Sequence, residues 1–108
     1  MIEFAVRIIE VCRVLPSDET HKHIHSQLVR SGMAPAPHYG EARGAESDKD
    51  FIHKLRIALK ELNESRIWLK IIIKANLIKQ KKLENLLDKC DQLCRILSAS
   101  IHTVRNKH

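Results

Sequence analysis

Hydrophobic side chains recur at helical spacing in four segments of the chain. In the first segment, residues 2–15, positions three or four apart would line one face of a helix. These positions are Ala5, Ile8, Ile9, Cys12 and Leu15. Pro16 follows directly. Because proline cannot continue the backbone hydrogen-bond ladder, the pattern predicts a helix over residues 2–15 and a turn after it.

The second segment has a weaker pattern. Ile24 and Leu28 face one side of a predicted helix over residues 19–31. Gly32 and the Ala-Pro-Ala-Pro run at 34–37 break or kink it. The string YGEARG that follows fits either a resumed helical turn or a loop, so the second helix can extend to residue 44.

The third segment has the most regular pattern, with apolar or small residues alternating at spacings of four and three. They are Phe51, Leu55, Ala58, Leu62, Ser65, Leu69, Ile72 and Asn76. This spacing is typical of a helix packed in a bundle. Ser47 and Asp50 have the spacing of a capping box, which predicts a helix over 48–75. Asn76 tolerates the left-handed conformation that ends helices, so we expect the chain to reverse there.

The fourth segment, residues 80–105, again carries a continuous apolar face. Its members are Leu83, Leu86, Leu87, Cys90, Leu93, Cys94, Leu97, Ile101 and Val104. Four helices with short connections, and no segment patterned as a strand, predict an all-α fold. We expect a single domain over residues 1–108, an antiparallel up-down-up-down four-helix bundle.

The predicted first helix is short for this bundle. Fourteen residues make a helix of about 21 Å, whereas the third helix would reach about 42 Å. We therefore expect either residues upstream of this chain or another subunit to cover the remaining half of the third helix.

Composition and charge narrow the class of protein. The chain has 108 residues, of which 30% are charged and 4% aromatic, and this length suits one domain. Residues 1–50 carry six Lys or Arg and eight Asp or Glu, a charge of −2. Residues 51–108 carry thirteen and five, a charge of +8. An odd number of cysteines, three, and no leader pattern favour a reducing cytoplasm, and no apolar run is long enough to span a membrane.

The basic surplus forms a ridge along the third predicted helix and the reversal after it. Its members are Arg66, Lys70, Lys74, Lys79, Lys81 and Lys82. The ridge predicts contact with the phosphates of RNA or another nucleic acid. The alternative is a solvated helix face that keeps the protein in solution. Because aromatic residues for base stacking are few, any binding should have weak sequence preference and steep salt dependence.

A second apolar stripe makes the third helix hydrophobic over more than one face. Its members are Ile52, Leu59, Trp68, Ile71 and Ile73. Exposed apolar patches usually mark interfaces, so we predict that this stripe, with Trp68 as its anchor, joins subunits of a homo-oligomer. The alternative is a wide core within one chain that partly covers Trp68.

Catalytic and metal-binding patterns are weak. Cys90 and Cys94 share a helix face, yet they lie in an apolar stripe that predicts core packing. The alternating histidines His21, His23 and His25 cannot converge from a helix. No phosphate loop or nucleophile motif occurs. We expect no enzyme activity, metal, cofactor or small-molecule substrate. A bundle metalloenzyme is a remote alternative because residues 50–53 contain one D-x-x-H step.

Four strings carry a resemblance to a known family. They are LVRSG (28–32), YGEARGAES (39–47), DFIHKLRIALKELNESRIWLKIIIKANLI (50–78) and LENLLDKCDQLCRILSASIHTVRN (83–106). Together they resemble the four-helix-bundle proteins also called 23S ribosomal RNA intervening-sequence proteins. The resemblance implies an up-down bundle, a ring-like homopentamer and no established enzyme activity. More distantly, it extends to the accessory proteins of diversity-generating retroelements, basic pentamers that bind nucleic acid and a reverse transcriptase.

These observations predict a non-enzymatic interaction or scaffold protein that binds copies of itself. The alternative function is that of a basic accessory protein that binds RNA, or an RNA–protein complex, without sequence preference.

Overall fold

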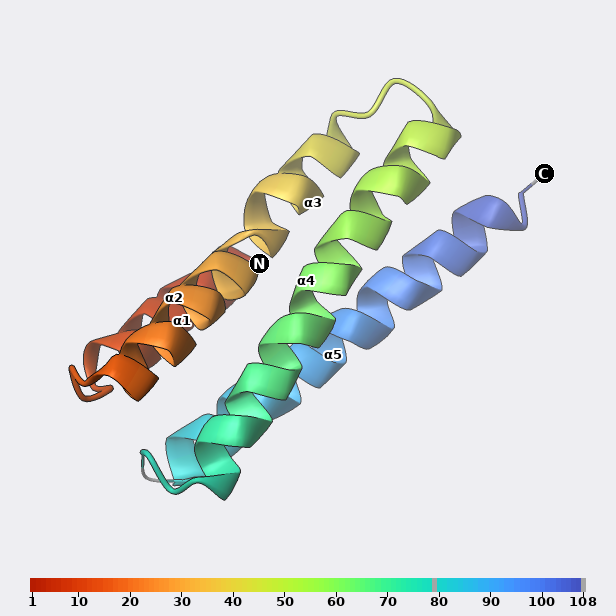
Figure 1. Ribbon diagram of the computed structural model, residues 1–108. Helices are drawn as coiled ribbons and strands as arrows, with labels where there is room; N and C mark the ends of the chain where they lie inside the picture. The colour runs from red at the N-terminus through yellow and green to blue at the C-terminus, as the bar shows by residue number, and fades with distance from the viewer. Residues whose placement is uncertain (79, 108) are drawn as a thin grey trace.

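The computed structural model describes residues 1–78 and 80–107, and it is a bundle of five α-helices (Figure 1). The helices are α1 (Ile2–Arg13), α2 (Glu19–Met33), α3 (Pro35–Arg43), α4 (Asp48–Lys74) and α5 (Gln80–Arg105). α3 continues the direction of α2, so the two act as one interrupted helix that runs alongside α4. The predicted all-α four-helix bundle is confirmed, and the described residues contain no strand.

The connection between α1 and α2 follows from proline and a capping carboxylate. α1 ends at Arg13, three residues before Pro16. Asp18 precedes α2, and its Oδ1 accepts a hydrogen bond from the backbone N–H of His21 at 2.9 Å. This satisfies a backbone donor that the first turn of a helix leaves without a partner.

The break between α2 and α3 lies at Ala34, directly before Pro35. Ala34 keeps helical dihedral angles, with φ −66° and ψ −35°. Proline has no N–H to donate to the preceding turn, so one backbone hydrogen bond is missing there while the chain direction is kept. The segment that the sequence left undecided is therefore helical from Pro35 to Arg43.

Two polar residues flank α4: Ser47 lies directly before it, and Asn76 lies two residues after its end. Ser47 Oγ accepts a hydrogen bond from the backbone N–H of Asp50 at 3.0 Å. At the other end, Asn76 has a φ of 54°, the left-handed conformation that reverses the chain.

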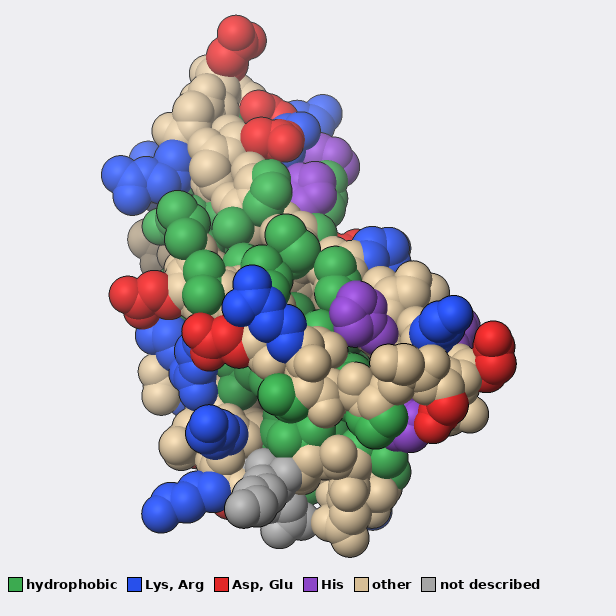
Figure 2. All heavy atoms as spheres, turned by 90° about the vertical axis from the view of Figure 1, so that its left-hand side faces the viewer, with side chains coloured by type: hydrophobic (Ala, Val, Ile, Leu, Met, Phe, Trp, Pro, Cys, Tyr) green, Lys and Arg blue, Asp and Glu red, His purple; other side chains and the backbone are tan. Residues whose placement is uncertain are grey.

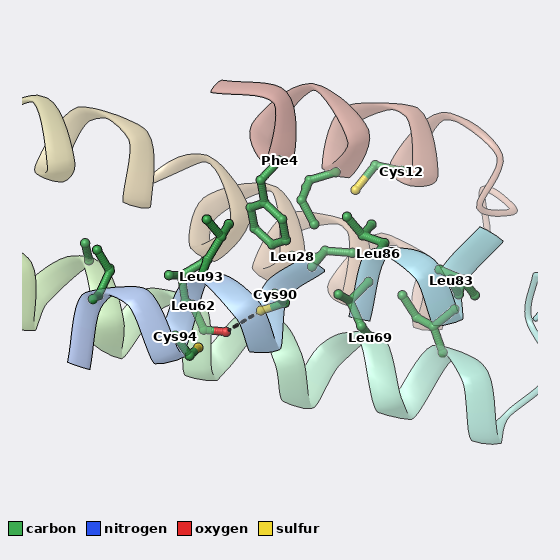
Figure 3. Packing of buried hydrophobic residues seen from close by; sticks show 14 of the residues in the cluster. Phe4, Cys12, Leu28, Leu62, Leu69, Leu83, Leu86, Cys90, Leu93 and Cys94 are labelled. Carbon is green, nitrogen blue, oxygen red and sulfur yellow. Dashed lines mark hydrogen bonds between the residues drawn. The ribbon is translucent and has the colours of Figure 1, made fainter. Parts of the chain in front are cut away.

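The core is built from one face of each long helix. Figure 3 shows Leu62 and Leu69 of α4 packed between side chains of α5 and of the α1/α2 pair. All six interior positions of the regular α4 pattern are buried: Leu55, Ala58, Leu62, Ser65, Leu69 and Ile72. Ser65 Oγ lies 2.9 Å from Ser31 Oγ, so the two buried hydroxyls hydrogen-bond across α2 and α4.

The helices are not equally covered. α4 packs against α5, α3 and α2, whereas α1 packs on α2, α5 and the start of α3 and lies diagonally across from α4. α1 has 12 residues and α4 has 27, so α1 covers only part of the bundle. That part is the end that contains the turn between α4 and α5 (Figure 1). No helix within the described ranges is long and apolar enough to cross a membrane.

Candidate functional site

A groove between α4 and α5 collects cationic side chains from both helices. We call it the α4/α5 groove. Its lining consists of Leu59, Asn63, Arg66, Lys70, Asp91, Cys94, Arg95 and Ser98. The α4 members are spaced by four, three and four residues, so they lie on one face of that helix. The antiparallel packing of α5 brings Arg95 to the same groove as Arg66 and Lys70.

The charge of this groove is only partly neutralised. Arg66 Nη1 lies 3.4 Å from Asp91 Oδ1. Among the described residues, no carboxylate lies within ion-pair distance of Lys70 or Arg95. The Nε of Arg66 is buried and finds no hydrogen-bond acceptor within the described part of the chain. Three cations and one carboxylate leave a positive surface above this buried donor.

A second hollow continues the same face toward the start of α4. It is lined by Asp48, Lys49, Ile52, His53, Arg56 and Arg105. Positions 52, 56 and 59 keep the spacing of four and three, so this hollow and the α4/α5 groove lie on one side of the helix pair. Asp48 Oδ2 lies 3.9 Å from Lys107 Nζ. Lys107 thus offsets the charge of Asp48. The cations Lys49, Arg56 and Arg105 extend the positive surface.

The two cysteines of α5 occupy different environments. Cys90 is fully buried, and its Sγ donates to the carbonyl oxygen of Leu62 at 3.2 Å (Figure 3). Cys94 is also mostly buried, at 8% exposed, but it lines the floor of the α4/α5 groove, and its Sγ lies 3.7 Å from the Oδ1 of Asn63. The core packing expected for both side chains is present, and Cys94 additionally touches the groove.

The pKa values of these thiols diverge. When Cys94 loses its proton, the Cys90 thiol can turn its hydrogen from Leu62 toward the new anion. That hydrogen bond, together with the charges of Arg66 and Arg95, lowers the pKa of Cys94 to about 7. The same contact with Cys94, together with burial, raises the pKa of Cys90. Cys94 is therefore the thiol of this pair that ionises.

The structure places the predicted basic ridge on more than one surface. Arg66 and Lys70 line the α4/α5 groove, and Lys74 is exposed at the end of α4. Lys81 and Lys82 are exposed in the first turn of α5 and line a hollow beside Val14 and Ile78. Lys79 lies outside the described residues. Sequence reasoning missed the groove cation Arg95 and, farther along, Lys49, Arg56 and Arg105. Arg95 and Arg105 join this side only through the α4–α5 register, whereas Lys49 and Arg56 follow the spacing within α4.

Trp68, the predicted anchor of a subunit interface, lies between α2 and α4. Its indole N–H donates to Glu64 Oε2 at 3.2 Å, and its ring meets the His23 ring edge-on with centroids 6.0 Å apart. Arg30 of α2 bonds the same Glu64 carboxylate and holds the pKa of Glu64 below its usual range. Trp68 is half-buried in this arrangement, as the wide-core alternative describes.

The other members of the predicted interface differ in exposure. Ile52, Leu59 and Ile73 are half-buried and pack against the core. Ile71 is 40% exposed, and Ile67, which is not part of the predicted stripe, is 53% exposed. These two isoleucines are one turn apart on the face of α4 that points away from the core. The interface assignment remains a prediction.

A further apolar area lies on the α1/α2 side of the molecule. Figure 2 shows hydrophobic side chains gathered across the middle of this face, with histidines and charged groups around them. Ile2 and Val6 of α1 are 75% and 47% exposed, and Met33 at the end of α2 is 40% exposed. The α1 face that carries Ile2 and Val6 lies opposite the buried Phe4 and Ile8.

The histidines of α2 serve local contacts. His21 Nδ1 lies 2.5 Å from Asp18 Oδ1, and His23 packs against Trp68. Within the described ranges, no group of three or more His, Cys, Asp or Glu side chains is arranged to hold a metal ion.

An antiparallel four-helix bundle with an interrupted second helix and a basic α4/α5 groove defines a class of small all-α bundle proteins. Residues 1–99 match the model of the 23S rRNA-intervening sequence protein family, and the chain belongs to this family. It is also similar to a crystal structure of a protein with unknown function from the S23 ribosomal protein family of Bacteroides thetaiotaomicron VPI-5482. The two chains share 34% identity over 93% of each, with a TM-score of 0.86. Neither description names an enzyme activity, and no curated protein matches the chain.

Proposed function

We propose that this protein is a non-enzymatic interaction unit of the cytoplasm whose copies join head to tail into a closed homo-oligomer. The observation that carries the proposal is a pair of exposed apolar faces on diagonally opposed helices. One face holds Ile2 and Val6 on α1, and the other holds Ile67 and Ile71 on α4. Apolar surface of this kind usually marks a contact site.

Charge supports pairing of one face with the other. Glu3 and Glu10 flank Ile2 and Val6 along the outer side of α1, and both are exposed. Lysines 60, 70 and 74 are exposed on the outer side of α4 around its isoleucines. The α1 face also carries Arg7 and the exposed Arg13, so its charge is mixed, whereas the lysines make the α4 face basic. Two α4 faces would repel each other, while Glu3 and Glu10 offer carboxylates to the lysines, so contact between unlike faces is favoured.

Contact between unlike faces has a geometric consequence. Such an interface is heterologous, and it closes into a ring when the rotation between copies divides the full circle. The resemblance to the intervening-sequence proteins implies five copies. In this assembly each chain would bury both apolar faces, which removes the cost of exposing them to water.

Light scattering after size exclusion tests the assembly. We expect a mass well above 12.5 kDa for the unaltered chain. Val6→Lys and Ile67→Lys should each prevent ring closure, whereas Ile96→Lys should not, although Ile96 is 55% exposed on α5. A 12.5 kDa monomer at every concentration, or equal disruption by Ile96→Lys, would contradict the proposal.

Mixing the two altered proteins distinguishes the kind of interface. The Val6→Lys chain keeps its α4 face and the Ile67→Lys chain keeps its α1 face, so the two should form a capped heterodimer when mixed. Neither variant alone should pass beyond a monomer, because each lacks one of the two unlike faces. A dimer of either variant by itself would instead indicate contact between like faces.

A second candidate function, binding of RNA without sequence preference, is favoured by Lys70 and Arg95 of the α4/α5 groove, which have no carboxylate partner in the described part of the chain. RNA phosphates would release counterions from this surface, so retention should fall steeply as salt rises. Filter binding of a mixed-sequence RNA should weaken with Lys70→Gln or Arg95→Gln and stay unchanged with Lys22→Gln on α2. No retention of the unaltered chain at low salt would exclude this function.

A further inference from the structure

The α4/α5 groove contains a nucleophile that neither proposed function uses. Cys94 lines the groove together with three cations, one carboxylate and the polar side chains of Asn63 and Ser98. Residues Arg66 and Lys70 come from α4, whereas Asp91 and Arg95 come from α5 one turn or less from Cys94. A thiol and a set of anion-binding groups therefore share one hollow.

The other two thiols lack this setting. Cys12 is buried in the core against the inner face of α1, and burial raises its pKa to about 11. Cys90 is fully buried, donates to the Leu62 carbonyl and does not line the groove. Both are inert by the usual criterion that a reactive thiol needs access and a stabilised anion.

The charges around Cys94 favour its anion. The titratable groups that face it are Arg66 and Lys70 from α4 and Cys90, Asp91 and Arg95 from α5. Burial and, to a smaller extent, the carboxylate of Asp91 oppose ionisation, but Arg66 lies 3.4 Å from that carboxylate and offsets its charge. The balance lowers the pKa of Cys94 to about 7, with the hydrogen bond from Cys90 as the first cause.

We propose that Cys94 is a modification site that undergoes thiol–disulfide exchange with small anionic disulfides held by Arg66, Lys70 and Arg95. The guanidinium of Arg66, together with Lys70 and Arg95, which have no carboxylate partner among the described residues, would bind carboxylate groups of the disulfide. This inference goes beyond self-association and does not depend on it.

The chemistry balances without a further oxidant. Cys94 first loses its proton to water. Its thiolate then attacks one sulfur of the disulfide R–S–S–R, a Cys94–S–S–R bond forms, and the original S–S bond breaks. The second half leaves as the thiolate RS⁻ with the bonding electron pair and takes up a proton from water according to its own pKa. One disulfide is consumed and one mixed disulfide is formed.

Cys90 cannot resolve the mixed disulfide by attacking the sulfur of Cys94. Cys90 lies one helical turn before Cys94, and the helix holds their Cβ atoms poorly for a disulfide bond. Cys90 is also buried with a raised pKa, so it lacks thiolate character. The modification should therefore persist until an external thiol reverses it.

The test compares two disulfide reagents on the folded full-length chain. The dianionic probe is 5,5′-dithiobis(2-nitrobenzoate), and the neutral probe is 2,2′-dithiodipyridine. We expect one of the three thiols to react fast with the dianionic probe, with a rate that rises with pH and levels off above about 7. Mass spectrometry should locate the adduct on Cys94. Cys94→Ser should abolish the fast phase, and Cys12→Ala should keep it.

Charge variants separate recognition from simple accessibility. Arg95→Gln should slow the dianionic probe about tenfold at low salt, and the neutral probe much less, because local charge concentrates only the anion. Lys82→Gln, a surface cation outside the α4/α5 groove, should change neither rate. A fast phase that survives Cys94→Ser, equal effects on the two probes, or no reaction before unfolding would overturn the proposal.

Discussion

At the scale of single residues, Gly32 determines how closely α1 approaches α2. A Cβ built on Gly32 would lie 2.7 Å from both Cγ1 and Cγ2 of Ile8, and 3.1 Å from the Ile8 Cβ. Ile8 is fully buried and β-branched, so it cannot rotate away from the contact. A glycine in the last turn of α2 is therefore required by the packing of two helices.

Gly32→Ala should destabilise the protein. Overpacking of a tight core costs about 1–3 kcal/mol, which exceeds the gain of up to about 1 kcal/mol from better helix propensity. Urea unfolding followed by circular dichroism would measure the change. Gly40→Ala is the matched control, since a Cβ there meets nothing within 4 Å, and it should leave stability unchanged or raise it. A stabilised Gly32→Ala protein would mean that α1 moves freely on α2.

The buried hydroxyls of Ser31 and Ser65 form a second contact at residue scale. They lie 2.9 Å apart, and Ser65 Oγ is also 3.0 Å from the Glu61 carbonyl oxygen. Ser65→Ala should cost about 1–2 kcal/mol because it removes one buried hydrogen-bonding partner. Ser31→Ala combined with Ser65→Ala should cost less than the sum of the two single changes. Additive losses in a double-mutant cycle, measured by urea unfolding, would show that the two hydroxyls are not coupled.

The sequence anticipated most buried positions but not the phase of every helix. The regular spacing of α4 predicted its six interior positions correctly because that spacing continues without a break from Leu55 to Ile72. In α1, apolar residues surround the helix, and the predicted face omitted Phe4, which is 1% exposed. Periodicity cannot fix the phase of such a helix, since only the neighbouring helices decide which apolar side is covered.

The candidate site was less predictable for a physical reason. Spacing along α4 identified Arg66 and Lys70 as neighbours, because that relation lies within one helix. Arg95 joins them only through the register of α5 against α4, which depends on how the reversal at Asn76 and the core side chains set the pair. A surface shared by two helices therefore needs the three-dimensional structure.

At the scale of elements, side-chain caps from described residues begin α2 and α4. Ser47 caps α4, the longest helix, which also carries Asp48 and Asp50 in its first turn. Asp18 caps α2 and accepts the backbone N–H of His21. These contacts fix where each helix starts and so how far it reaches along its neighbour.

Ser47→Ala should lower the free energy of unfolding by about 1 kcal/mol, since the N–H of Asp50 loses its acceptor. Thermal unfolding monitored by circular dichroism would detect the shift. Ser26→Ala, at an exposed position inside α2, makes the same chemical change without a cap and should have little effect. Equal effects of the two substitutions would contradict the role of Ser47.

The Asp18 cap should make α2 sensitive to acid. Hydrogen bonds from His21 hold the pKa of Asp18 below its usual range. A carboxyl whose pKa is lowered by folding adds stability above its unfolded-state pKa, and this stability is lost as the pH falls through its folded-state pKa. The stability difference between the unaltered chain and Asp18→Ala should therefore be full at neutral pH and shrink in acid. A difference independent of pH would exclude the carboxylate as the cap.

At the scale of the whole molecule, the bundle is elongated. It measures 49 × 20 × 19 Å with a radius of gyration of 14.9 Å, against about 13 Å for a compact domain of this length. Four helices surround the core at the end near α1, whereas α3, α4 and α5 alone form the other end. In α3 only Pro35 and Ala42 are buried.

Amide hydrogen exchange should follow this asymmetry. Backbone amides of α3 should exchange faster than those of the middle of α4, around Leu62 and Leu69, because fewer apolar contacts close over α3. Nuclear magnetic resonance or mass spectrometry would map the rates under native conditions. If α3 exchanges only through global unfolding, at the same free energy as α4, the two ends are equally stable. That result would contradict the prediction that the α3 end opens more easily.

The only tryptophan of the chain makes the contact between α2 and α4 visible by fluorescence. Trp68 is half-buried, bonded through its indole N–H to Glu64 and covered at its edge by His23. Emission from this indole therefore reports one defined junction, free of signal from any other tryptophan. Its emission maximum would shift to longer wavelength if water reached the ring. Quenching by dissolved iodide would show how often the contact between α2 and α4 opens.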